Sequence, residues 1–365
     1  MLKFFKKEAV FCIALLLTII TIFFNTPTRE YLNAIDFKML SILFSLMAVS
    51  SALKKSGFLE TIAINITKHF TSFRSIALLL IYIVFFSAML LTNDVSLLVF
   101  IPFTLLLICD IEEKNIIILI ILETLAANLG SMATPIGNPQ NLFIYSAFNL
   151  SIKDFFVTML LPTALSFILL TLSTFLFCSK NIQLKVHEKE TSFDKKNTAI
   201  NFILLTLVLL TVFKVLDFRI PLTVVLLYML FFARSLFKEI DYFLLLTFIC
   251  FFIFSYNISH IEVVNFLLTK LMDKAALLTS TLTSQVISNV PAAVLLSSAT
   301  SNWKELMLGV DIGGLGTLIA SLASLISFKF YANRESSNKG KYIAFFSAFN
   351  FIYLIILYVT TKVLL

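Results

Sequence analysis

Long apolar stretches of about membrane-crossing length constrain this chain more than any other feature of its sequence. A helix needs about 20 residues to cross the roughly 30 Å hydrocarbon layer of a bilayer. Nine stretches approach or reach that length, two of them with interruptions: 9–24, 37–53, 116–149, 156–177, 198–216, 220–237, 242–258, 304–328 and 342–361. Only 13% of the residues are charged and 59% are hydrophobic, too few charges for the surface of a soluble domain. The sequence therefore predicts an all-α polytopic membrane protein with about nine crossings.

Two further apolar stretches, 75–108 and 276–300, are interrupted near their middles by polar residues. The interruptions are Thr92-Asn93-Asp94 and Ser288-Asn289-Val290-Pro291. We interpret each stretch as a re-entrant hairpin that enters and leaves the bilayer on one side. The arm lengths also fit full spans.

The basic residues indicate an orientation. With a cytoplasmic N-terminus and re-entrant hairpins, 19 of the 28 Lys and Arg residues fall on the cytoplasmic side. Cytoplasmic loops of membrane proteins are enriched in these residues. The first apolar run follows three lysines and is not followed by a cleavage site, so we interpret it as an uncleaved first span.

Three landmarks recur in the same order along the chain, 205, 196 and 183 residues apart. They are Asp36 and Asp241 before a span, Asn93 and Asn289 at a hairpin tip, and the polar, Gly-containing runs that begin at Asn128 and Asp311. Five crossings separate the two starts, which would invert the second half relative to the first. We predict a first repeat at 1–177, a cytoplasmic linker and extra helix at 178–217, and a second repeat at 218–365. Each repeat would contain one hairpin and one broken helix, 116–149 or 304–328.

Glycine is scarce but concentrated: six of the eight glycines lie in the two broken helices. They are Gly130, Gly137, Gly309, Gly313, Gly314 and Gly316. Small residues can serve close helix packing. Gly combined with Pro, Asn and Thr instead indicates unwound helix, and paired interruptions in two halves are typical of a transporter binding site.

The predicted substrate- and ion-binding residues are those of the tips and breaks. They are Thr92, Asn93, Asp94, Asn128, Gly130, Ser131, Thr134, Gly137, Asn138, Ser288, Asn289, Asp311, Gly313, Gly314 and Thr317. Hydroxyl, amide and carbonyl oxygens suit a hard monovalent cation, and helix N-termini with amide donors suit a carboxylate or another oxyanion. No Lys or Arg lies in either tip or break core, so dipoles, amides and a co-bound cation would hold an anion.

Three acids, Asp94, Glu123 and Asp311, lie nearest the membrane interior. Acids at that depth are costly and are candidates for proton or cation coupling. The alternative is helix N-capping for Asp94 and Asp311, and an interfacial, snorkelling position for Glu123.

Other chemistry finds little support in the sequence. Four widely spaced cysteines and three histidines form no metal-ligand or disulfide pattern, and we predict neither a metal site nor a cofactor beyond Na⁺ or H⁺ as coupling ion. No nucleophile is paired with a base, so we do not predict an enzyme. The net charge of +7 fits basic cytoplasmic loops better than nucleic-acid binding.

The motifs resemble those of the ion transporter superfamily, and in particular its citrate-transporter-like branch. This branch groups arsenite permeases, sodium/proton antiporters, the P protein and citrate carriers, and the divalent-anion symporters are relatives in the superfamily. The resemblance covers nearly the whole chain. It rests on Leu91-Thr92-Asn93-Asp94 with Pro102, the run Ala127–Asn141, Ser288-Asn289-Val290-Pro291, and the run Gly309–Ser321.

The resemblance implies a scaffold, two opposed hairpins and elevator-type alternating access, commonly in a homodimer. Divalent-anion/sodium symporters of the superfamily carry Ser-Asn-Thr at both tips to hold sodium and the substrate carboxylate. Here Asp94 and Val290 replace the third residue, which favours the arsenite, P-protein and sodium/proton members. In the last motif, Leu318 and Ala320 replace the usual Pro and Gly of arsenite permeases.

We expect a secondary active transporter in the lipid bilayer of a bacterial inner membrane. Its partners would be a small inorganic or organic anion, carboxylate- or arsenite-like, and a coupling cation, sodium or proton. The alternative is a sodium/proton antiporter without an organic substrate. A passive channel is disfavoured, since a pore needs a continuous wet path.

Overall fold

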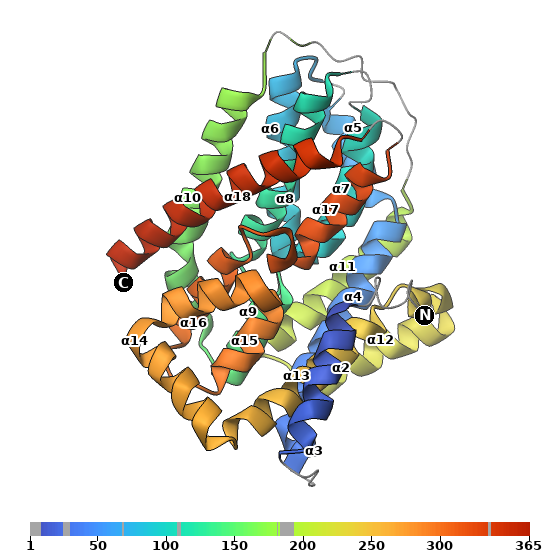
Figure 1. Ribbon diagram of the computed structural model, residues 1–365. Coiled ribbons are helices and arrows are strands. Elements are labelled where there is room, and N and C mark those ends of the chain that lie inside the picture. The colour runs from blue at the N-terminus through green and yellow to red at the C-terminus, as the bar shows by residue number, and fades with distance from the viewer. Residues whose placement is uncertain are drawn as a thin grey trace.

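The computed structural model describes residues 9–24, 30–67, 69–107, 111–180, 182, 193–334 and 337–365. These residues form α-helices and two short 3₁₀ helices, with no β-strand among them (Figure 1). In the first half the helices are α2 (Ala9–Ile22), α3 (Glu30–Ala34), α4 (Phe37–Lys55), α5 (Phe58–Thr67), α6 (Phe73–Leu91), α7 (Asn93–Leu107), α8 (Glu113–Ser131), α9 (Pro139–Ala147) and α10 (Ile152–Phe177). They continue with α11 (Lys195–Val212), α12 (Arg219–Phe231), η1 (Arg234–Lys238), α13 (Tyr242–Ser259), α14 (Glu262–Ile287), α15 (Asn289–Ser297), α16 (Trp303–Gly313), η2 (Leu318–Ala320), α17 (Leu322–Ala332) and α18 (Lys339–Leu364).

Seven of the described helices are long and apolar enough to cross a membrane: α4, α6, α8, α10, α11, α13 and α18. The protein is therefore a polytopic membrane protein, as predicted. The stretch predicted as one span at 220–237 divides into α12 and η1. Ala233 leaves the helical conformation there, and the Arg234 side chain donates from Nε to the Leu230 carbonyl at 2.8 Å, which caps the end of α12.

The helices form two groups. A scaffold group consists of α2, α4, α11, α12 and α13, in which α2 packs on α13 and both α11 and α12 pack on α4. A hairpin group consists of α6 to α10 and α14 to α18, with α8 in contact with α6, α7, α10, α17 and α18. In Figure 1 the scaffold group lies mainly to the lower right, α10 lies to the left, and α18 runs across the view toward the C-terminus at the left. In α8, 94% of the residues in the apolar span are buried inside the protein, compared with 28% in α10 and in α18. Helix α8 is therefore a central helix.

Each stretch predicted as a hairpin forms two helices joined at the polar tip, and each stretch predicted as a broken helix is interrupted. Re-entry of the hairpins into the membrane stays a prediction. The first hairpin is α6, Thr92 and α7. The second begins after a kink at Ala275 inside α14, the residue before the predicted start, and turns at Ser288 into α15. The first broken helix is α8 and α9, and the second is α16 followed by η2 and α17.

The elements follow one another in the same order in the two halves. The series α4, α5, α6, α7, α8, α9, α10 corresponds to α13, the two parts of α14, α15, α16, α17 and α18. This order supports two repeats, and their inverted orientation stays a prediction. The predicted linker falls largely on 183–192, outside the described residues, as do the lysines that precede the first span.

Candidate functional site

The two hairpin tips have the same unusual backbone. Thr92 has φ 79° and ψ 152°, and Ser288 has φ 74° and ψ 155°. Residues with a Cβ rarely occupy this region, at a cost of about 1–3 kcal/mol each, and such strain is concentrated at binding sites and switches. The surrounding structure therefore imposes one conformation on both tips, although the residues differ.

Each tip is held by the break of its own half through matching atoms. Thr134 Oγ1 donates to the Met89 carbonyl at 2.5 Å, and Thr317 Oγ1 donates to the Gln285 carbonyl at 3.2 Å. Met89 and Gln285 each lie three residues before the tip residue. The two threonine hydroxyls are thus used in holding the hairpins, which gives Thr134 and Thr317 a structural function in this conformation.

A second contact joins each tip to its break. The backbone N–H of Asn93 donates to the Gly137 carbonyl at 3.0 Å, and Ser288 Oγ donates to the Ala320 carbonyl at 3.2 Å. Gly137 and Ala320 are 183 positions apart, the same separation as Asn128 and Asp311.

The two halves also bond to each other in reciprocal pairs. Ser321 Oγ donates to Asn128 Oδ1 at 3.1 Å, and Asn138 Nδ2 donates to Asp311 Oδ1 at 3.1 Å. A shift of 183 positions converts one pair into the other. Asn128 in the last turn of α8 and Asp311 in the last turn of α16 therefore each meet the residue that precedes the second helix of the opposite break.

Further donors surround these pairs. Asn93 Nδ2 donates to Asn128 Oδ1 at 3.2 Å, and Gln140 Nε2 donates to Asp311 Oδ1 at 3.0 Å. Asn138 Nδ2 also reaches Ser131 Oγ at 3.3 Å. The network links one tip and both breaks in one buried polar cluster.

A small cavity of about 10 Å³ lies where the tips and breaks meet. Its lining includes Asn93, Asp94, Gln140, Asn289 and Ser321, with Leu244 of α13 from the scaffold group. We call it the tip cavity. Its volume is about that of one water-sized probe, so in this conformation it has room for a water molecule or a small monovalent ion.

Four helices begin at the tip cavity. Asn93, Pro139, Asn289 and Leu322, the first residues of α7, α9, α15 and α17, all line it. Each N-terminus carries a partial positive charge. The backbone N–H groups of Asn93, Asp94 and Val290 donate to protein oxygens in this conformation. The positive ends of four helices thus compensate for the lack of a Lys or Arg side chain in the lining.

Two carboxyl groups oppose this positive potential. Asp94 lies in the first turn of α7. Its Oδ1 and the Oδ2 of Asp311 are both buried and have no hydrogen-bond partner among the described residues. Asp311 lies in the last turn of α16, so the N-capping alternative for this residue is wrong. Both acids have an oxygen available for a proton or a cation.

Glu123 lies apart from this cluster. It is fully buried on α8, and its Oε1 accepts a hydrogen bond from Thr104 Oγ1 of α7 at 2.5 Å. The structure therefore contradicts the interfacial, snorkelling alternative. It also divides the three predicted coupling acids into a pair at the site and one outside it.

The predicted glycines determine how closely the chain segments approach. A Cβ on Gly130 would lie 2.2 Å from the Phe85 carbonyl oxygen, and one on Gly137 would lie 2.0 Å from the Ser131 carbonyl oxygen. Gly313 and Gly314 are buried at the end of α16, where a Cβ would meet Ser284 or Asn289. These glycines permit close packing of the site and offer no ligand side chains.

Two glutamines belong to the site although neither was among the predicted binding residues. Gln140 binds Asp311, and it lies inside the first broken-helix motif, where its position was a usable signal. Gln285 Nε2 donates to the Gly313 and Leu315 carbonyls, both at 2.7 Å, and Gln285 Oε1 accepts from the Thr317 amide at 2.9 Å. The signal for Gln285 was a lone amide side chain in an otherwise apolar and hydroxyl-bearing arm.

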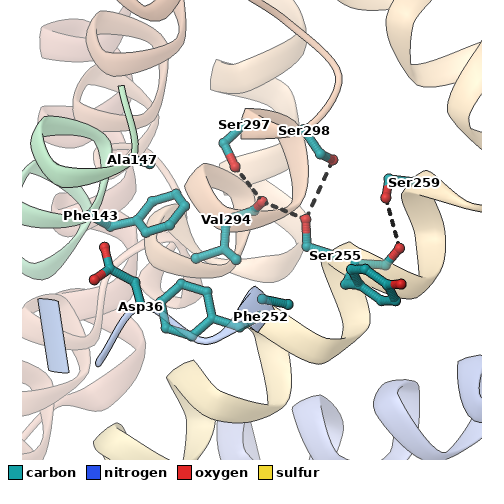
Figure 2. A pocket seen from close by; sticks show the side chains of 11 residues that line it. Asp36, Phe143, Ala147, Phe252, Ser255, Ser259, Val294, Ser297 and Ser298 are labelled. Atoms are coloured by element: carbon teal, nitrogen blue, oxygen red, sulfur yellow. Dashed lines mark hydrogen bonds between the residues drawn. The ribbon is translucent and has the colours of Figure 1, made fainter. Parts of the chain in front are cut away.

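A larger cavity of about 310 Å³ lies at the boundary between the two helix groups (Figure 2). We call it the side cavity. Phe252 and Ser255 of α13 line it from the scaffold group, and Phe143 and Val294 line it from α9 and α15. Phe143 is one helical turn from Pro139 and Val294 one turn from Val290, so the side cavity lies next to the tip cavity along both helices.

Polar contacts cross the same boundary at the end of α9. Ser146 Oγ donates to Asp36 Oδ2 at 2.6 Å, and Lys214 Nζ donates to the Leu150 carbonyl at 2.6 Å. The pKa of Lys214 is lowered mainly by the partial burial of its ammonium group and to a smaller extent by repulsion from Lys38. These contacts fasten the hairpin group to the scaffold group beside the side cavity.

Comparison with known proteins agrees with this architecture. Residues 5–313 match the family model described as citrate transporter. The chain is 36% identical over 304 residues to an uncharacterized transporter of Methanocaldococcus jannaschii, covering 82% of each protein. It is 30% identical over 313 residues to the inner membrane protein YbiR of Escherichia coli, covering 84% of this chain and 83% of the relative. A shorter match of 149 residues, 34% identical, covers 40% of this chain and 30% of a silicon efflux transporter of Oryza sativa.

Proposed function

The chain belongs to the citrate transporter family, whose members are transporters and not enzymes, and on this premise we propose that it moves a small anion or oxyanion across the inner membrane. The transport would be secondary active, coupled to a proton or sodium gradient, with the tip cavity as its binding site. One observation carries the proposal: four helix N-termini converge on a cavity whose polar lining consists of three amide side chains, the Ser321 hydroxyl and the Asp94 carboxyl group. Such N-termini bind carboxylates and other oxyanions through backbone N–H groups.

The charges around the tip cavity support coupling. A helix N-terminus is equivalent to roughly +0.5 charge, and the C-termini of α6 and α14, which end at the same tips, carry the opposite sign. Asp94 and Asp311 oppose the positive helix ends when both are ionised. An anion is therefore held well only when these acids have bound protons or when a cation accompanies the anion, which is the requirement for symport.

The side cavity supports alternating access. It lies between the scaffold group and the hairpin group, and the contacts made by Asp36 and Lys214 beside it must break if one group moves against the other. In the proposed orientation, with a cytoplasmic N-terminus, this cavity faces the outside. We propose an elevator-type movement of the hairpin group in a homodimer.

A sodium/proton antiporter is the second candidate. The tip cavity has room for one small ion, and its neighbouring groups include two carboxyl groups with free oxygens. Carboxylates, amides and hydroxyls are ligands that suit a hard cation. In this case Asp94 and Asp311 would exchange protons for sodium without any organic substrate.

A thermal-shift screen of purified protein would identify the ligand, since a ligand that binds only the folded state raises the apparent stability. The screen should contain citrate, dicarboxylates, arsenite, sodium and lithium, and also silicic acid because of the rice relative. An anion that stabilises the protein would then be tested for uptake into proteoliposomes.

The Asn289→Ala variant should reduce this uptake about tenfold or more, because a buried amide at a tip is lost. Asn265→Ala, on α14 before the Ala275 kink, is the matched control and should transport normally. Sodium-dependent proton flux in the absence of any anion would contradict the proposal and support the antiporter.

A further inference from the structure

Glu123 is a buried acid that the tip cavity does not use. Its side chain has no exposed surface, and its one hydrogen-bond partner among the described residues is the neutral hydroxyl of Thr104. Oε2 has no partner there. An ionised carboxylate is costly in such a position, so the side chain is protonated in this conformation.

The helices packed on α8 present few charged or titratable groups to Glu123. On α18, Tyr342 is near enough to interact electrostatically with Glu123, and its hydroxyl also interacts with the Thr124 side chain of α8. On α17, Tyr331 stacks on Tyr342 with ring centroids 4.7 Å apart. The charged residues of the other neighbours are at helix ends: Arg74 on α6, Asp94 on α7, and Lys153 and Asp154 on α10.

The tyrosines connect this region with the end of α8. Tyr331 donates from its hydroxyl to Glu113 Oε1 at 2.7 Å, and Glu113 is only partly buried in the first turn of α8. Glu123 lies ten residues further, about 15 Å along the helix, and Asn128 about 7.5 Å beyond it. Glu123 is thus between the surface end of α8 and the tip cavity.

Helix α7 links Glu123 to the site mechanically. Asn93 and Asp94 at its N-terminus line the tip cavity, and Thr104 near its other end holds Glu123. A displacement of the first hairpin relative to α8, as a gating movement within the hairpin group, would change both contacts. Entry of water during that movement would solvate the carboxylate and allow the Glu123 O–H bond to break, with the proton passing to water and the carboxylate remaining on α8.

We propose that Glu123 is a proton-binding site of the transport cycle, separate from the tip cavity, loaded in the present conformation and unloaded when the first hairpin moves. This inference rests on the proposed transport function and assigns the proton to one residue. It requires Glu123 to change its protonation state during each cycle, which a permanently protonated structural acid would not do.

The test compares Glu123→Gln, a neutral replacement of the same shape, with the wild type in proteoliposomes, using the anion found in the thermal-shift screen. Accumulation driven by a pH gradient should fall about tenfold or more, within the usual range of coupling between sites, while exchange of internal for external substrate continues. Glu112→Gln, at the exposed start of the same helix, is the control and should retain both activities. Wild-type accumulation by Glu123→Gln would overturn the proposal.

Thr104→Val provides a second variant that leaves the carboxyl group in place. This change removes the one hydroxyl that donates to Glu123 among the described residues. The hydroxyl stabilises the ionised carboxylate, so the pH profile of uptake should move toward higher pH while the maximal rate remains. If Glu123→Gln does not fold, an unchanged profile for Thr104→Val overturns the inference. If the wild type moves no anion but exchanges sodium for protons, the proposed function has failed; loss of that exchange in Glu123→Gln would still support the proton site, and its persistence would overturn it.

Discussion

The two hairpins share the geometry of their tips but differ in their arms and in their chemistry. Helix α7 of the first hairpin has 15 residues, and α15 of the second has 9. Nine residues make about 14 Å of helix, less than half the hydrocarbon layer. The arm α15 is therefore shorter than a span, both tips line one cavity, and re-entry of the two hairpins stays a prediction.

The acids occupy opposite places in the two halves. In the first half Asp94 follows the tip asparagine and Asn128 lies at the end of the helix before the break. In the second half Val290 follows the tip asparagine and Asp311 lies at the end of the helix before the break. The repeated framework holds the site, and its two charges come from positions that do not correspond. The site is therefore symmetric in its backbone and asymmetric in the positions of its carboxyl groups.

Exchanging the residues at the break should have the largest effect. Asp311→Asn makes the second break resemble the first and removes one acid, so coupled uptake should fall about a hundredfold. The double variant Asn128→Asp/Asp311→Asn moves the acid to the matching position and should recover part of the uptake, measured in proteoliposomes. A double variant no better than Asp311→Asn would show that the two positions are not equivalent.

Replacing glycines by alanine should destabilise the protein to different extents at the two breaks. Gly137→Ala places a Cβ against backbone and should destabilise the protein by about 3 kcal/mol or more, as forced overpacking does. Gly314→Ala meets the movable side chain of Asn289 and should cost less. Gly340→Ala has its nearest atom at 3.7 Å and serves as the control in thermal unfolding of purified protein. Equal melting temperatures for the first two variants would contradict the difference.

Gln285→Met copies the residue found three positions before the first tip. It leaves the Gly313 and Leu315 carbonyls without their donor, and unsatisfied buried groups cost about 1–3 kcal/mol each. We expect a lower melting temperature and weaker stabilisation by the ligand. An unchanged melting temperature would mean that Gln285 does not hold the second break.

Glycine at the tips should have the smallest effect. Thr92→Gly removes the side chain from a strained conformation and should stabilise the protein by about 1 kcal/mol. Ser288→Gly gains the same relief but loses the hydrogen bond to Ala320, so its stability should change little. Thermal unfolding of both variants measures the difference, and a destabilised Thr92→Gly would mean that the Thr92 side chain has a contact essential for the tip.

Much of the framework was predictable because its signals are local. Hydropathy marked the spans, and polar residues in apolar runs marked both tips within a residue or two. Gly, Pro and Asn marked the breaks, since these residues unwind a helix wherever they occur. The kink at Ala275 and the end of α12 before η1 depend on backbone and capping contacts that hydropathy does not record.

The sequence by itself determined that the chain enters the membrane, where its helices break, and which residue types gather at those breaks. Only the tertiary structure decided which of these residues meet: Asn128 with Ser321, Asp311 with Asn138 and Gln140, and Glu123 with Thr104 away from them all. Hydropathy and helix-breaking are properties of neighbouring residues. Pairing between residues more than 170 positions apart, as in the first two groups, depends on how the helices pack, and so does the convergence of four helix N-termini on one cavity.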